Sequence, residues 1–409
     1  MGRVPRRMLL WIAFAIVHVW VAAAGWWMPN QPMGDVNLVY EPWSSRALSG
    51  EGIVGVTEAW VYPQLALLPM VLTHLLAGIA GYNVGWAVLV TLLDALAFAL
   101  LLGDGRSRPR RRAAWFWLLF AALLGPVGMY RLDAITVPVA IAGLLRLATR
   151  PAVAGAVLAV GAWLKVWPAA LAAAAFVAMR RRGRVLTGAV VASAVIVAAV
   201  VAAGGAAHLL GFVTMQTGRG LQLEAPVSAV YLWGWMLRLP GWWVFYDTDI
   251  LTFQVTGPQV DTVISLMTPA LFLAVAAVAA LGYAKARRGA SFLVLFPPLG
   301  LALTLAFMVF NKVGSPQFHD WLIAPLVLWL VVDARGARVP AAIALASAAL
   351  TQIVYPLLYT GVMLGEPGAV LVLTARNGLL VWLLVWAVVR VARAPVRART
   401  TAAAELSPS

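Results

Sequence analysis

Apolar stretches of about 18 residues or more recur throughout the chain, and they restrict it to very few folds. Met8–Met28, Val84–Leu102 and Thr262–Tyr283 are three examples. Lipid offers no partners to exposed backbone groups, so such stretches must be helical, whereas the strands of an outer-membrane barrel would give short alternating segments. With 63% hydrophobic and 11% charged residues, the 409-residue chain is predicted to be an all-α polytopic membrane protein, a single integral membrane domain over residues 1–409.

The basic links between these stretches decide how the chain is threaded, because cytoplasmic loops carry an excess of Lys and Arg. The threading that places most of the 30 Lys and Arg residues inside has about twelve transmembrane helices and both termini in the cytoplasm. It requires Val61–Ala80 to lie in the outer interface and Ala152–Met179 to form two short helices that turn near Lys165–Pro168. Threading each of these segments as one full span leaves fewer basic residues inside. The other predicted spans are Met8–Met28, Val84–Leu102, Ala113–Met129, Leu132–Leu147, Val185–Ala203, Thr262–Tyr283, Ala290–Phe310, Trp321–Val332, Val339–Tyr359 and Ala369–Val389.

The formal net charge of +15 does not indicate a nucleic-acid partner, because the basic residues follow the links between spans and the tail 390–409. The partner that this distribution predicts is the lipid bilayer. We interpret the first helix as an uncleaved anchor; with or without cleavage, Gly34 onward lies outside the cytoplasm. The chain has no cysteine, so disulfides and thiolate metal sites are excluded.

Most acidic residues fall in the predicted external segments, and two of these segments, 29–60 and 204–261, are long. Asp35 follows the first helix and precedes Val36–Ser49, which has the composition of an interfacial helix. At the edge of an apolar cavity this carboxylate would act as a general base. The alternative is that Asp35 caps the helix that begins at Val36.

Three charged positions interrupt otherwise apolar segments, where unpaired charge is expensive. Arg131 and Asp133 either pair with each other or contact a substrate. Lys165 faces a cavity or an anion, unless it extends to the interface from a helix end. Arg376 binds an anion or pairs with Glu366.

Two polar segments complete the candidate site. QTGRGLQLEAP places Arg219, Gln222 and Glu224 on a glycine-containing loop, and NKVGSPQFHDW places Lys312 and His319 where they could hold a phosphate. The aromatic residues that follow Pro226 could stack on sugars, although interfacial belts use the same residues. No HExxH, Walker or GxSxG motif occurs, so neither a metal nor a cofactor is expected.

Separated cations and one candidate base in an outward-facing cavity are typical of group transfer from a phosphate-bearing lipid. The cations would stabilise the charge that grows on the leaving phosphate, and the base would deprotonate an acceptor hydroxyl. A transporter would instead show internal repeats and paired broken helices, and no repeat is visible. The residues therefore favour an enzyme over a transporter.

Several segments resemble glycosyltransferase family 87, membrane enzymes of the C fold. The resemblance is carried by Asp35 with Tyr40 five residues later and by GIVGVTEAWVYPQLALLP, AGAVLAVGAWLKVWPA, RGLQLEA, NKVGSPQFHDWLIAP and TARNGLL, in the family's order. It is closest to the polyprenyl-phosphate-mannose-dependent mannosyltransferases of the phosphatidylinositol-mannoside type. Ala225-Pro226 and Gln64 depart from the family's pattern, which puts the acceptor and the branch in doubt rather than the fold.

The resemblance implies an inverting, metal-independent mannosyl transfer, without a cofactor, from polyprenyl-phosphate mannose to a glycolipid hydroxyl. It implies a bacterial plasma-membrane location and an extracytoplasmic site, with Asp35 as general base. The implied donor-phosphate residues are His319, Lys312, Arg219, Arg376 and Lys165, and the implied sugar and acceptor residues are Gln222, Glu224, Tyr62, Gln317, Arg131 and Asp133. The alternatives are another polyprenyl-phosphate sugar, such as arabinofuranose, or a lipid-linked sugar flippase.

Overall fold

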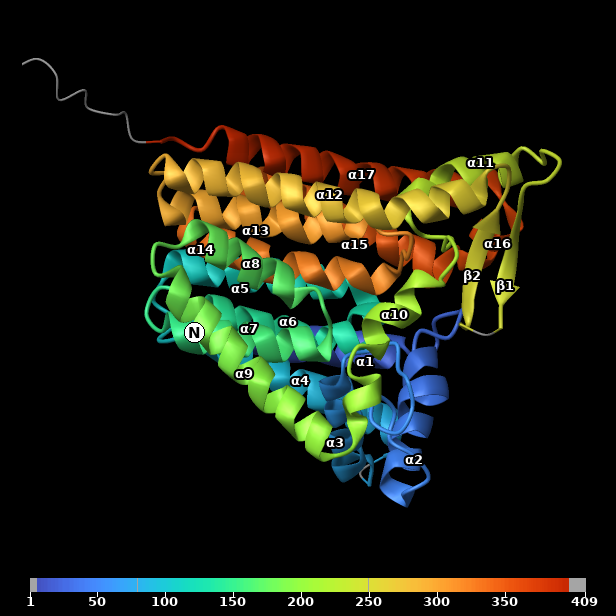
Figure 1. Cartoon of the computed structure of the whole chain (residues 1–409), viewed down its shortest axis with the longest axis horizontal. Coiled ribbons are helices and arrows are strands. Elements are labelled where there is room, and N and C mark those ends of the chain that lie inside the picture. The colour runs from blue at the N-terminus through green and yellow to red at the C-terminus, as the bar shows by residue number, and fades with distance from the viewer. Residues whose placement is uncertain (1–5, 79, 249, 397–409) are drawn as a thin grey trace, which may run out of the picture.

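A computed structural model describes residues 6–78, 80–248 and 250–396. Most of the described chain is helical, and the long helices lie side by side with their axes roughly parallel (Figure 1). This arrangement confirms the predicted class, a helical polytopic membrane protein. The predicted basic tail is described only as far as Val396, so Arg397 and Arg399 lie outside the described residues.

Seven of the described helices are long and apolar enough to cross a membrane. They are α1 (Arg6–Ala24), α4 (Tyr82–Leu102), α9 (Arg182–Ala202), α12 (Val260–Arg287), α13 (Phe292–Val309), α15 with the π-turn η7 (Arg338–Gln352 and Ile353–Leu357) and α17 (Pro367–Ala392). Shorter helices occupy the other predicted spans: α5 (Arg108–Leu124), α6 (Leu132–Leu144), α7 (Pro151–Leu164), α8 (Pro168–Ala178) and α14 (Ile323–Val332). Val61–Ala80 holds the 3-10 turn η2 (Gln64–Ala66) and the short helix α3 (Leu67–Ala77).

The predicted break in Ala152–Met179 is confirmed, because α7 ends at Leu164 and α8 begins at Pro168. Lys165 has extended backbone angles at this break. Helix α7 packs closely against α9 through glycines. A Cβ atom on Gly155 would lie 2.0 Å from the Val185 carbonyl oxygen, so only glycine permits this approach.

The elements outside the long helices gather at one end of the molecule (Figure 1). From the first half of the chain they are the π-turn η1 (Val36–Tyr40), α2 (Glu41–Ser49) and the 3-10 turn η3 (Gly125–Gly128). From the second half they are η4 (Gly205–His208), α10 (Gly211–Thr217), η5 (Pro226–Ser228), α11 (Ala229–Met236), strands β1 (Trp243–Asp247) and β2 (Thr252–Thr256), η6 (Pro316–Leu322) and α16 (Tyr359–Leu364). The helix predicted over Val36–Ser49 is thus confirmed as η1 followed by α2.

The strands form an antiparallel hairpin, which the all-α prediction missed. Trp243 pairs with Thr256 and Asp247 with Thr252. WVFYD and TFQVT are rich in the aromatic and β-branched residues that favour strands, and their shortness hid that signal among the aromatics expected at a membrane interface.

A separate hydrophobic cluster fixes the segment 29–60 against α3 and α4. Val36 and Tyr40 are fully buried in it, and Tyr40 packs against Trp86 with a distance of 4.9 Å between ring centroids. The turn that follows Asp35 is therefore anchored in the protein core. This anchoring gives the Asp35 carboxylate a defined position.

Candidate active site

Residues that are distant in sequence meet at the end of the molecule where the short helices, turns and hairpin gather. We call these the outer elements, because they lie outside the long helices. Asp35 precedes η1, Arg131 precedes α6, and Lys165 lies between α7 and α8. The loop that carries Gln222 runs next to the loop that carries Lys312, since the Gln222 backbone N–H donates to the Lys312 carbonyl over 3.0 Å. Two of the segments that resemble family motifs, RGLQLEA and NKVGSPQFHDWLIAP, are therefore neighbours in space.

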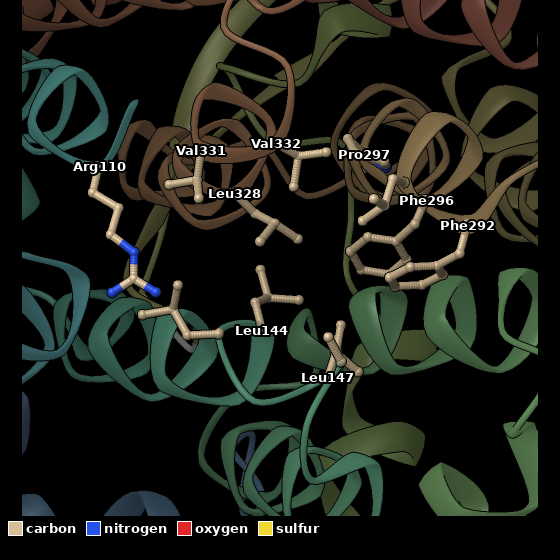
Figure 2. Close-up of a pocket in the computed structure, with 12 residues that line it drawn as sticks. Arg110, Leu144, Leu147, Phe292, Phe296, Pro297, Leu328, Val331 and Val332 are labelled. Carbon is tan, nitrogen blue, oxygen red and sulfur yellow. The ribbon is translucent and has the colours of Figure 1, made fainter. Parts of the chain in front are cut away.

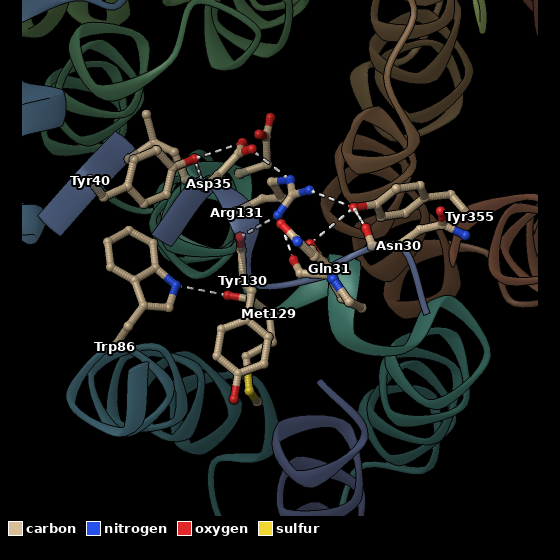
Figure 3. A network of polar contacts seen from close by, with 12 residues as sticks. Asn30, Gln31, Asp35, Tyr40, Trp86, Met129, Tyr130, Arg131 and Tyr355 are labelled. Atoms are coloured by element: carbon tan, nitrogen blue, oxygen red, sulfur yellow. Dashed lines mark hydrogen bonds and ion pairs between the residues drawn. The ribbon is translucent and has the colours of Figure 1, made fainter. Parts of the chain in front are cut away.

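Asp35 is the half-exposed acid of this cluster (Figure 3). Its Oδ2 lies 3.2 Å from Nε of Arg131, and the two side chains are 32% and 7% exposed. Arg131 also donates to the Pro32 and Tyr130 carbonyls, at 2.6 and 2.9 Å. Burial lowers the pKa of Arg131, but the Asp35 carboxylate and neighbouring tyrosines raise it more, so the guanidinium stays charged. The predicted pairing of Arg131 with Asp133 is wrong, because Arg131 points toward Asp35 in the segment 29–60 and Asp133 pairs with Lys165.

The interpretation of Asp35 as a helix cap is also wrong. Its side chain makes no capping hydrogen bond to the turn that follows. Tyr40 contacts it instead: the Tyr40 hydroxyl accepts the Leu132 backbone N–H at 3.1 Å and donates to Asp35 Oδ2 at 3.5 Å. Burial raises the pKa of Tyr40 well above its ordinary value, so this hydroxyl keeps its proton.

Tyr355 is a site residue that the sequence analysis missed. Its hydroxyl accepts from Arg131 Nη2 at 3.3 Å and donates to the Asn30 carbonyl at 2.9 Å (Figure 3). Tyr355 thereby connects the Arg131 guanidinium to the start of the segment 29–60. The sequence signal for Tyr355 is the Tyr-Pro pair within an apolar segment. A proline there interrupts the helix and leaves backbone groups without helical partners.

Asp133 pairs with Lys165 at the break between α7 and α8. Lys165 Nζ lies 3.1 Å from Asp133 Oδ2, and Trp321 donates to Oδ1 at 2.6 Å. The ammonium group also lies over the Tyr62 ring, 4.7 Å from its centroid. Lys165 is thus a partly exposed cation held between a carboxylate and an aromatic face, rather than a side chain extended to the interface.

Arg376 is paired deep in the protein with Glu224. Its Nη1 contacts the Glu224 carboxylate, and its Nη2 donates to the Glu224 carbonyl at 2.8 Å. The alternative partner, Glu366, is therefore wrong. Burial raises the pKa of Glu224 although Arg376 opposes the shift. Both side chains are almost fully buried, so this pair fixes α17 to the RGLQLEA loop.

Arg219 and Lys312 form a cationic region on the two adjacent loops. Burial lowers the pKa of both, and Arg219 further lowers that of Lys312, so the two charges are close enough to repel. Arg219 Nε is buried and has no hydrogen-bond partner among the described residues. An anion between these side chains would satisfy this donor and remove the repulsion.

Tyr62 connects the cationic region with the carboxylates. Burial raises its pKa, and the charges that modify this shift identify its neighbours: Lys165, Asp35, Asp133 and Arg219. The Asp35 carboxylate and the Arg219 guanidinium therefore both act electrostatically on the Tyr62 side chain.

His319 is buried away from this region, and its two ring nitrogens contact the Pro316 carbonyl at 3.1 Å and Ser347 Oγ at 3.0 Å. Because His319 and Arg376 use their hydrogen bonds within the protein, the structure gives no support to their predicted phosphate contacts. Gln222 and Gln317 are buried on the two adjacent loops. Within residues 6–78, 80–248 and 250–396, no group of three or more His, Asp or Glu side chains could hold a metal ion.

The fold and this cluster define a polytopic helical membrane protein with a charged site at one end of its helices. The chain belongs to glycosyltransferase family 87, whose sequence model matches residues 60–294, and it is therefore a membrane glycosyltransferase. This match confirms the family resemblance, and it includes Tyr62, Asp133, Lys165 and Arg219. No curated protein matches the chain.

Proposed function

We propose that the protein transfers a mannosyl unit from polyprenyl-phosphate mannose to a hydroxyl of a glycolipid, a phosphatidylinositol mannoside or a related glycan. The donor is a lipid, which suits a site at the end of membrane helices. The reaction uses no nucleotide, because the phosphate ester is already an activated leaving group. The observation that carries the proposal is the partly exposed Asp35, held by Arg131, together with an Arg219 guanidinium whose Nε has no hydrogen-bond partner among the described residues.

Asp35 is the general base. Both of its contacts with Arg131 and Tyr40 fall on Oδ2, which leaves Oδ1 for the acceptor. Oδ1 takes the proton of the acceptor hydroxyl as the hydroxyl oxygen forms a bond to the anomeric carbon. The bond from that carbon to the donor phosphate breaks, and its electron pair leaves with the phosphate. Attack opposite the leaving group inverts the anomeric configuration.

Arg219 and Lys312 bind the donor phosphate. Their positive charges stabilise the negative charge that the phosphate gains as it leaves. Lys165 and Tyr62 lie between the phosphate and the base and contact the sugar. Asp133, predicted as a sugar contact, is fully buried and instead holds the Lys165 ammonium in place. The Arg376–Glu224 pair positions the RGLQLEA loop, which carries Arg219.

The proposed topology has about twelve spans, both termini in the cytoplasm and the site on the extracytoplasmic face of a bacterial plasma membrane. The links α4–α5, α8–α9, α12–α13 and α14–α15 lie at the end opposite to the outer elements (Figure 1). Together with the helix turns that adjoin them, these links carry 13 of the 24 described arginines. This segregation supports the assignment of that end to the cytoplasm.

The test supplies purified protein with radiolabelled polyprenyl-phosphate mannose and a membrane lipid extract. We expect label to move to a new lipid, which identifies the acceptor. Polyprenyl-phosphate arabinofuranose serves as the competing donor, and transfer from that donor alone would reassign the sugar. Movement of intact donor across proteoliposomes without transfer would support a flippase and contradict the proposal.

A further inference from the structure

A cavity lies at the basic end of the molecule, the end where the arginine-rich links α4–α5, α8–α9, α12–α13 and α14–α15 lie. It has a volume of about 120 Å³ and lies between the last turns of α6 and α14 and the first turns of α13 (Figure 2). Its walls are apolar side chains such as Leu144, Phe296 and Val331, and Arg110 is the charged residue among those that line it. The cavity is comparable in size to apolar cavities that bind small hydrocarbon groups in other proteins.

Arg110 has little to hold it in place. Its Nη1 donates to the Leu101 carbonyl at 3.5 Å, which is a weak hydrogen bond. Nearby, Arg111 donates to the Gly105 carbonyl and Arg146 to the Ala142 carbonyl. In the described part of the chain none of these three guanidinium groups forms an ion pair with a carboxylate. Their charge is therefore not neutralised by the described protein.

The cavity adjoins the first turns of α13, a helix long and apolar enough to span the membrane. It therefore lies near the level where lipid phosphates and acyl chains meet. A ligand that matches both of its features carries a hydrocarbon chain for the apolar walls and a negative charge for Arg110. A free phosphate matches only the guanidinium, and a neutral lipid matches only the walls.

We propose that this cavity binds one anionic phospholipid, with an acyl-chain segment among Leu144, Phe296 and Val331 and the phosphate on Arg110. The bound lipid joins α6, α13 and α14 at this end, because its chain fills the space between them. The site is separate from the transfer site and does not depend on the reaction proposed there. Its occupant is a structural or regulatory lipid rather than donor or acceptor.

The test measures lipid binding to delipidated protein in a neutral detergent by native mass spectrometry, with the midpoint of thermal unfolding as a second readout. The probes are long-chain phosphatidylglycerol, long-chain phosphatidylcholine, dibutyryl phosphatidylglycerol and inorganic phosphate. We expect long-chain phosphatidylglycerol to bind most tightly and to raise the midpoint. Arg110→Gln should weaken this binding about fivefold, the effect of one basic residue on an anionic lipid. Val331→Phe should weaken it by filling the cavity.

The matched control is Arg112→Gln, which removes the same charge from an exposed position of the same helix that does not line the cavity. It should leave the binding of phosphatidylglycerol unchanged. Equal losses in Arg110→Gln and Arg112→Gln would show diffuse attraction to the basic end and overturn the proposal. Equal effects of phosphate and phosphatidylglycerol, or no preference over phosphatidylcholine, would overturn it as well. If Arg110→Gln does not fold, Arg110→Lys, which keeps the charge, should bind while Val331→Phe does not.

Discussion

The two ends of the molecule carry positive charge in opposite ways. At the end that carries η1, α2 and the hairpin, Arg131 and Arg376 are buried and Lys165 is partly exposed, and each is paired with a carboxylate. At the basic end, Arg110 and its neighbours contact backbone carbonyls instead. A buried charge needs a partner within the protein, because low-dielectric surroundings make an unpaired ion costly, whereas a charge at the interface can use water or lipid phosphates. At this paired end Arg219 is the exception, because its Nε has no hydrogen-bond partner among the described residues, and we expect an anionic group of the substrate there. At the basic end the expected partners are water and lipid.

The largest effect expected from the paired end is on the rate of transfer. Asp35→Asn removes the base but keeps the size of the side chain, so we expect the transfer rate to fall by about 10²–10⁴-fold. The measurement is initial rate of label transfer at saturating donor, with the unfolding midpoint as a check on folding. The control is Glu51→Gln, which removes an exposed acid from the same segment 29–60 and should keep wild-type activity. Unchanged transfer by Asp35→Asn would remove Asp35 from the mechanism.

The next effect is on the free energy of unfolding, and it should differ between a paired arginine and an exposed arginine at the basic end. Arg376→Met leaves Glu224 buried without its partner, so we expect a loss of about 3–5 kcal/mol in the free energy of unfolding. Arg112→Gln at the exposed basic end should change it by less than about 0.5 kcal/mol. Denaturant unfolding in detergent measures both. The double variant Arg376→Met with Glu224→Gln should recover part of the loss, and a double variant as unstable as the sum of the single changes would show that the two residues are not coupled.

A smaller effect concerns the unpaired cation at the active site. Arg219→Gln removes the charge that would hold the donor phosphate, so we expect kcat/KM for the donor to fall about ten- to a hundred-fold. The free energy of unfolding should change little, because the Arg219 guanidinium forms no ion pair with a described residue. The control is Arg238→Gln, an exposed cation after α11. A fall in kcat/KM of the same size in both variants would point to general electrostatic attraction.

The smallest effect is a dependence of donor binding on pH. The protonated Lys312 is the form that binds phosphate, and burial together with Arg219 lowers its pKa. Donor binding should therefore weaken as pH rises through this lowered pKa, at a lower pH than an ordinary lysine would show. Lys312→Arg should make the donor KM nearly constant from about pH 7 to 10, since arginine keeps its charge. Arg219→Gln should shift the weakening to higher pH, and an equally steep rise of KM in Lys312→Arg would exclude Lys312 as its origin.

The helical class and the break at Lys165 could be predicted because apolar length, proline position and basic links act locally along the chain. The ion pairs could not. Sequence proximity suggested Arg131 with Asp133 and Arg376 with Glu366, but each arginine pairs across the fold, with Asp35 and Glu224. These choices depend on how helices cross, which a local pattern does not specify. Tyr355 was missed for the same reason, since its partners lie at the start of the chain.

The contact between Tyr355 and the Asn30 carbonyl also has a consequence for biosynthesis. These residues are 325 positions apart, so the ribosome needs roughly 15–65 s to proceed from one to the other. During that time Arg131 can already approach Asp35, but the hydroxyl that braces the guanidinium does not yet exist. The arrangement around Arg131 is therefore completed only late in translation, and a chain that terminates before η7 would carry Asp35 and Arg131 without this support.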